Sequence, residues 1–175
     1  IRALSEKRSI SGKKLGALIC KSSYDYLAEN SPDEALKATF SVVELSPEKW
    51  LPLRKAYNSF NKNYFKAASK NRYIYTMLEA AAQSAEHYAE DYSNGEFNPG
   101  FALDLKDFAE RTKENFPYSL NPATRERLTK SADDLISAID SAVAYNISGE
   151  IRGGSNGIAT YYPLSKSAEE FELYQ

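Results

Sequence analysis

Cysteine and histidine are scarce in this chain of 175 residues, which has one of each, Cys20 and His87. A single cysteine excludes a disulfide within the chain. Any Ser-His-Asp or Cys-His arrangement built from this chain alone would have to use His87. Transition-metal sites need several His or Cys ligands at close spacing, so one residue of each type argues against zinc.

Basic charge and long apolar runs are lacking as well. Lys and Arg number 22 against 24 Asp and Glu, which gives a formal net charge of −2 and an isoelectric point near 5.6. This balance argues against a nucleic-acid partner, because binding to phosphates normally needs a basic face. No apolar run approaches the ~20 residues of a membrane helix, and no signal-peptide pattern opens the chain. We therefore expect no membrane span and no nucleic-acid partner.

What the chain does have is an ordinary globular composition. Hydrophobic residues make up 42% and charged residues 26%, so a chain of this length is expected to fold around one core. It opens at Ile1 rather than Met, from which we expect that an upstream part was removed or lies on another chain. The sequence itself leaves the cellular compartment undecided.

The first part of the chain predicts a basic lead-in, a helix and a strand. Residues 1–14 carry five basic residues against one acid and are expected to be a solvated lead-in. Residues 15–46 predict a helix that is capped by Ser11 and joined to a strand at about 38–45. The strand is indicated by a short run of β-branched and aromatic residues.

Residues 47–150 predict a region of packed helices. Ser46 as N-cap and Pro47 at the first helical position favour the start of one helix. A stripe of small and apolar residues predicts another helix over 73–88. This second prediction places His87 in the interior of a helix.

The rest of the chain predicts further helices and then a second strand. One helix is expected to begin near Leu103, and Asn121 is expected to cap a longer one whose apolar face runs to Val143. The final part, 151–175, predicts a loop, a strand at about 157–162 and a C-terminal tail.

Two strands separated by a helical array cannot make a stable sheet of their own, because an isolated two-stranded ribbon is marginal in water. We therefore expect the strands at about 38–45 and 157–162 to join a sheet built by residues outside this chain. The fold class expected from the sequence is a larger α/β protein, of which this chain is a mostly helical part.

Few side chains are candidates for chemistry, and each has a structural explanation. A partly exposed helical histidine is the favoured interpretation of His87, and a small buried thiol that of Cys20. Two pairs of acids raise the question of a cation site, but neither lies in an EF-hand type of loop. The two pairs are Asp104 with Asp107 and Asp133 with Asp134. Positions at helix starts or on solvated faces explain these acids better than a cation site does. We therefore predict no catalytic, cofactor-binding or metal-binding residue in this chain.

Four segments, in order, resemble the C-terminal region of the clostripain-like cysteine peptidases, which are related to caspases and gingipains. Each segment is short, so the specificity of the resemblance lies in their order and spacing over about 10–165. The first is similar to the family's Leu-Ser-Ala-Ile-Asp-Leu-Ser strand, with Glu44 in place of aspartate. The second resembles an Asp-Leu-x-Asp-Phe-Ala helix start, the third a helix ending in Val-x-Tyr, and the fourth a Gly-Leu-Ser-Ile-Tyr-Phe-Pro strand. In this chain they are Phe40–Ser46, Asp104–Ala109, Ala138–Tyr145 and Asn156–Pro163.

The resemblance implies a caspase-like sheet and cleavage of peptides after Arg or Lys by a His/Cys dyad upstream of the matched region. The family's Asp-Ala-Cys segment does not occur here, so no catalytic residue is carried over and Cys20 is not the nucleophile. The partners implied are the upstream catalytic region or chain and a protein or peptide substrate. The resemblance also implies a bacterial, secreted or cell-envelope location, and it alone raises calcium as a cofactor. The alternative is a noncatalytic helical interaction module or a homologue that lacks the dyad.

Overall fold

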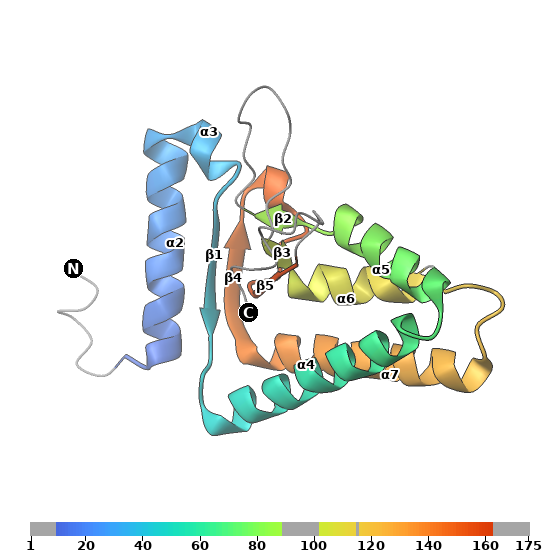
Figure 1. Ribbon diagram of the computed structural model, residues 1–175. Helices are drawn as coiled ribbons and strands as arrows, with labels where there is room; N and C mark the ends of the chain where they lie inside the picture. Colours follow the sequence, from blue (N-terminus) through green and yellow to red (C-terminus); the bar gives the residue numbers. More distant parts are fainter. Residues whose placement is uncertain (1–9, 89–101, 115, 163–175) are drawn as a thin grey trace, which may run out of the picture.

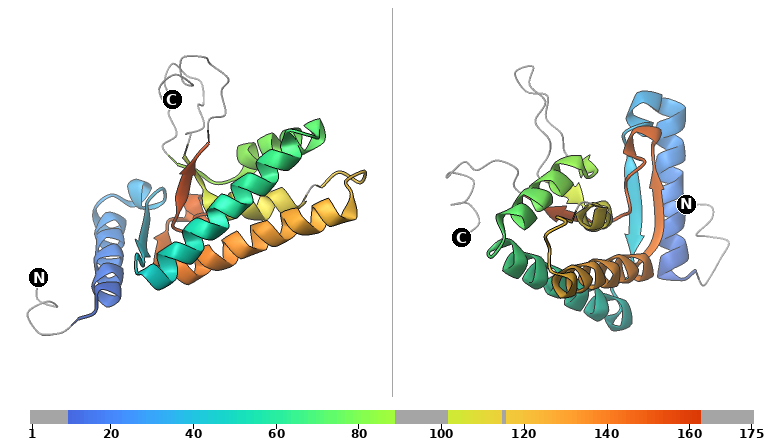
Figure 2. Two further views of the ribbon diagram at one scale, coloured as in Figure 1. Left: turned by 60° about the horizontal axis from the view of Figure 1, so that its bottom comes forward. Right: turned by 90° about the vertical axis from the view of Figure 1, so that its right-hand side faces the viewer.

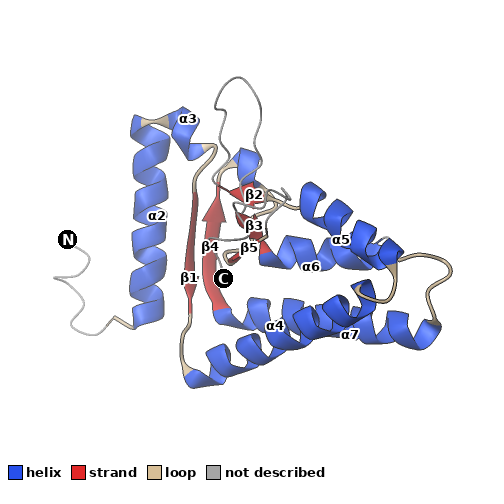
Figure 3. Ribbon diagram, viewed as in Figure 1, coloured by secondary structure: helices blue, strands red, loops and turns tan. Residues whose placement is uncertain are grey.

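The computed structural model describes residues 10–88, 102–114 and 116–162. This part of the chain is mostly helical, as predicted, with two small antiparallel sheets (Figures 1 and 3). The helices are α2 (Gly12–Asn30), α3 (Pro32–Ala35), α4 (Pro47–Ala68), α5 (Arg72–Ser84), α6 (Leu105–Glu114), α7 (Pro122–Ala142) and a 3₁₀ turn, η2 (Glu150–Arg152). The strands are β1 (Thr39–Val43), β2 (His87–Tyr88), β3 (Ala102–Asp104), β4 (Val143–Ser148) and β5 (Ala159–Tyr161).

The predicted helix starts are confirmed. The Ser11 hydroxyl accepts a hydrogen bond from the Lys14 amide at 3.4 Å, and the Asn121 side chain accepts one from the Ala123 amide at 3.0 Å. Ser46 occupies the N-cap of α4 with Pro47 in the first turn, although its hydroxyl makes no capping bond. Side chains of this kind satisfy the amides that a helix leaves without partners at its N-terminus.

The first sheet is a two-stranded ribbon of β1 and β4, with Phe40 opposite Ile147 and Val42 opposite Tyr145. Helix α2 covers one face of the ribbon, on the side away from the other long helices (Figure 2). The helix and ribbon approach closely at Gly16, where a Cβ atom would lie 2.8 Å from the Val42 side chain. On the other face, the Ser41 hydroxyl donates to the Gly157 carbonyl at 2.8 Å.

The second sheet has the strand order β2-β3-β5, and all its pairings are antiparallel. The expectation of only two strands, without partners in this chain, is therefore wrong. The predicted strand at 38–45 pairs with β4, and the one at 157–162 pairs with β3. Strand β4 was predicted as helix, because its first apolar residues continue the spacing of α7 and no Gly or Pro separates Ala142 from Val143.

The core lies among α4, α5, α6 and α7. Ile74, Leu128 and Leu135 have no exposed surface, and Ile139 has 1%. Helix α4 crosses α7 along much of its length, while α6 lies between α7 and α5 (Figures 1 and 2). In the described ranges, no helix is both long and apolar enough to cross a membrane.

Candidate functional site

Cys20 and His87 lie in different parts of the molecule. Cys20 is on α2, and the β1-β4 ribbon separates this helix from β2, which carries His87 (Figure 1). Cys20 is 8% exposed, which confirms the prediction of a buried thiol. The prediction of a partly exposed helical histidine is wrong, because α5 ends at Ser84 and His87 is a buried strand residue. Its Nε2 atom lies 2.8 Å from the Ala82 carbonyl oxygen.

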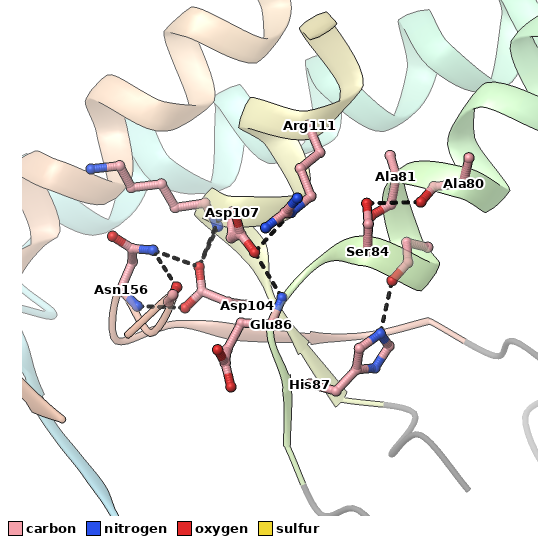
Figure 4. A network of polar contacts seen from close by, with 12 residues as sticks. Ala80, Ala81, Ser84, Glu86, His87, Asp104, Asp107, Arg111 and Asn156 are labelled. Atoms are coloured by element: carbon pink, nitrogen blue, oxygen red, sulfur yellow. Dashed lines mark hydrogen bonds and ion pairs between the residues drawn. The ribbon is translucent and has the colours of Figure 1, made fainter. Parts of the chain in front are cut away.

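The most extensive polar cluster is centred on Asp104, which is completely buried (Figure 4). One carboxylate oxygen accepts hydrogen bonds from the amides of Lys106 at 3.0 Å and Asp107 at 2.9 Å, so Asp104 caps α6. The same oxygen accepts from Asn156 Nδ2 at 3.2 Å, and the other accepts from the Asn156 amide and from the Tyr88 hydroxyl at 2.9 Å. The predicted helix-start role is confirmed, and the predicted solvation of this acid is wrong.

Asp107, in the first turn of α6, extends the cluster. Its Oδ2 atom accepts from the Glu86 amide at 2.7 Å and from Arg111 Nε at 3.0 Å. Arg152 donates to Glu86 Oε1 at 3.1 Å and to the His87 carbonyl at 2.6 Å. Asp107 is 8% exposed, so solvation is the wrong explanation for this acid too.

The cluster is suited to holding segments together rather than to catalysis. Five donors surround the Asp104 carboxylate, and two of them belong to a helix N-terminus, where negative charge is stabilised. A carboxylate that is buried and surrounded in this way leaves little free space for a substrate. The described residues contain no group of three or more His, Cys, Asp or Glu side chains that is placed to hold a metal ion.

The acids Asp133 and Asp134 on α7 are exposed, as predicted for a solvated face. Asp133 pairs with Lys113 at 2.7 Å, and Asp134 pairs with Lys130 at the same distance. A hollow of about 810 Å³ beside these pairs is lined largely by such charged side chains. Exposed pairs of this kind contribute little to stability and give no evidence of a site.

A smaller and more apolar pocket, of about 420 Å³, lies between α4, α5, α6 and β5. Eight of the fourteen lining residues that the structure describes are aromatic, and none of the fourteen is charged. The ring of Phe60 lies 4.4 Å from that of Tyr64 and 5.9 Å from that of Phe108, measured between centroids. The 13 tyrosines of the sequence signalled amphipathic packing, but tyrosines scattered along the chain do not indicate which of them share a cavity.

Burial affects the phenols around this pocket. It raises the pKa of Tyr64 to about 12, against a smaller opposing effect of the hydroxyl of Thr112, which donates to the Tyr64 hydroxyl at 3.0 Å. Burial also raises the pKa of Tyr162, and nearby Tyr75 and Glu79 add to the shift. Both phenols therefore stay neutral over the physiological pH range.

The four segments that carry the resemblance meet in two pairs. Strand β1, from the first segment, pairs with β4, which begins within the third. The second segment meets the fourth where Asp104 binds Asn156 and where the Leu105 amide donates to the Ile158 carbonyl at 2.9 Å. The bond from Ser41 to the Gly157 carbonyl links the two pairs.

Comparison with known proteins adds no assignment. No protein-family model, no curated protein and no solved structure matches this chain. The resemblance to clostripain-like peptidases therefore remains an expectation from the four sequence segments.

Proposed function

We propose that this chain is the noncatalytic C-terminal part of a clostripain-like cysteine endopeptidase, which cleaves peptides after Arg or Lys. The observation that carries the proposal is the meeting of the four resembling segments. The four segments are short and are separated from one another in the sequence, yet each contacts another of the four.

The β1-β4 ribbon supports a further contact with the catalytic part. Within the described residues each of its strands has one neighbour, so one edge of each strand is without a strand partner. Sheet edges of this kind are sites where additional strands pair. Helix α2 beside the ribbon exposes Leu18, Ile19 and Tyr26, at 43%, 56% and 66%. We propose that this side of the chain packs against a caspase-like core sheet.

In this proposal the chemistry belongs to residues upstream of the chain. A cysteine thiolate attacks the scissile carbonyl, a histidine transfers protons, and backbone amides stabilise the oxyanion. The residues described here supply scaffold: the cluster around Asp104 fixes α6, β2 and the loop before β5 relative to one another. Neither Cys20 nor His87 has a role in the reaction.

The second candidate is a noncatalytic interaction module or a homologue without the dyad. It is favoured by the same exposed apolar side chains on α2, which would then meet a different protein. The two candidates differ upstream of this chain, where only the peptidase has a histidine and an Asp-Ala-Cys segment.

A peptidase assay on the native parent protein tests the proposal. We expect cleavage of peptides after Arg or Lys, and its loss when the cysteine of the upstream Asp-Ala-Cys segment is replaced. The matched control is Cys20→Ala, which should keep the activity of the parent to within about twofold, because Cys20 is a buried thiol on α2 that has no part in the proposed dyad. Loss of activity in Cys20→Ala with an unchanged melting temperature would contradict the proposal, as would an inactive parent without the upstream segment.

A further inference from the structure

We propose that the aromatic pocket between α4, α5, α6 and β5 binds a small, uncharged molecule built on a flat ring system. Its volume of about 420 Å³ lies within the range of ~300–1,000 Å³ that is usual for small-molecule sites. Tyr57, Phe60 and Tyr64 come from α4, Phe108 comes from α6, and Tyr162 follows β5. This site is separate from the proposed peptidase function and does not depend on it.

The rings that line the pocket favour a flat ligand. Phe60 and Phe108 meet edge to face, whereas Phe108 and Tyr162 are tilted with centroids 5.4 Å apart. Rings in these orientations offer both faces and edges to another ring, and such contacts add to the effect of apolar burial. Four separate elements line the pocket within a short span, although Phe65, Tyr75 and Tyr161 leave one side open to solvent. A short, multi-walled space of this kind suits a small molecule better than an extended peptide.

The absence of charge among the described lining residues selects against ionised ligands. A carboxylate that entered this pocket would lose its hydration and would meet no cationic side chain among the described lining residues. The neutral state of the buried phenols of Tyr64 and Tyr162 keeps the walls uncharged. An uncharged ligand incurs no such loss.

One wall offers a polar contact that specifies the ligand further. The hydroxyls of Tyr57 and Thr160 are 3.2 Å apart and share one hydrogen bond, in which either group is the donor. The bond uses only one of the two hydroxyl hydrogens, so the pair retains a hydrogen that can be donated to a ligand. We therefore expect the ligand to carry a hydroxyl or carbonyl oxygen at the edge of its ring system.

Fluorescence titration of the 175-residue chain with 2-naphthol tests the site, with 2-naphthoate as the charged probe of similar shape. We expect 2-naphthol to bind at least about tenfold more tightly than 2-naphthoate. Ala68→Phe, which places a ring at the lining of the pocket, should abolish binding, whereas Ala28→Phe on the exposed side of α2 should not. Equal affinity for the two probes, or binding that survives Ala68→Phe, would overturn the proposal.

A second variant keeps the test decisive if Ala68→Phe does not fold. Replacing Tyr57 with Phe and Thr160 with Val together removes both hydroxyls while nearly preserving shape. Affinity for 2-naphthol should then fall about fivefold, whereas affinity for naphthalene, which has no oxygen, should stay the same.

A remaining outcome would identify an internal occupant. In the full chain, Phe171, Leu173 and Tyr174 can be replaced together by Ala. If these replacements tighten the binding of 2-naphthol by about tenfold or more, the C-terminal segment competes for the pocket, and the small-molecule proposal is overturned. Unchanged affinity supports the proposal.

Discussion

The ribbon side of the molecule, made of α2, β1 and β4, differs from the helical core of α4, α5, α6 and α7 in how much it buries. Cys20 is the one residue of α2 that is buried. No residue of β1 or β4 is fully buried. In the helical core, Phe60, Ile74 and Leu135 are 2% exposed or less. The helical core therefore holds most of the chain's own stability, whereas the ribbon side retains surface that a further part of the protein can cover.

The largest effect is expected where the helical core meets the second sheet and the loop before β5, in Asp104→Ala. Removing the carboxylate leaves donors from Tyr88, Asp107 and Asn156 without their acceptor inside the protein. We expect the free energy of unfolding to fall by about 4 kcal/mol, measured by urea unfolding. Asp133→Ala on the exposed face of α7 is the matched control and should change it by less than about 0.5 kcal/mol. Equal losses in the two variants would show that the buried cluster does not hold α6 to β2 and the loop before β5.

The next effect separates the regions directly. Leu135→Ala removes a side chain with no exposed surface from the helical core and should lower the free energy of unfolding by about 3 kcal/mol. Ile19→Ala on α2 truncates a side chain that is 56% exposed and should cost less than about 1 kcal/mol. Similar costs at the two positions would break the distinction between the regions.

Alkaline pH should weaken the helical core through Tyr64. Its phenol has an ordinary pKa of 10.0 in the unfolded chain, and burial raises the pKa to about 12 in the folded chain. The contribution of the neutral Tyr64 phenol to the stability of the folded chain is complete below pH 10. It is lost as the pH rises to 12, because in that interval the unfolded chain releases the proton and the folded chain keeps it. Urea unfolding across this interval should show that the free energy of unfolding falls by about 2 kcal/mol more in the unsubstituted chain than in Tyr64→Phe. Identical pH dependence in the two chains would contradict this account.

A smaller effect is expected in the loop that connects the ribbon to the second sheet. Gly157 has φ of +94°, which side-chain-bearing residues rarely adopt, and a Cβ atom there would lie 3.0 Å from Ser41 and 3.1 Å from Val143. Gly157→Ala should lower the free energy of unfolding by about 1–2 kcal/mol. Gly12→Ala, where a Cβ atom meets nothing within 4 Å, serves as the control and should not destabilise the chain. A loss of stability in Gly12→Ala as large as in Gly157→Ala would refute the role of the backbone conformation.

The sequence predicted features that depend on local signals. The caps at Ser11 and Asn121 and the strand after Ala38 follow from residues next to one another in the chain, and they are confirmed. Strand β4 was missed because the apolar positions of α7 continue into it at Val143. A period-two pattern of Val143, Tyr145 and Ile147 was the signal that indicated a strand.

The polar cluster and the pocket were not predictable in the same way. Asp104 is buried because Asn156, which is 52 residues further along the chain, donates to it, and sequence spacing gives no measure of that approach. The pocket likewise joins rings from four elements. A composition rich in tyrosine indicated that such rings exist, but only their packing shows which of them share a wall.

The most direct test of the central proposal is peptide mass mapping of the native parent protein, read for the residues upstream of Ile1 and for any chain that co-purifies. The account predicts an upstream region, on the same chain or an associated one, with a histidine and an Asp-Ala-Cys segment. A parent that begins near Ile1, with no such partner chain, would contradict the peptidase proposal and leave a helical module whose exposed ribbon side binds something else.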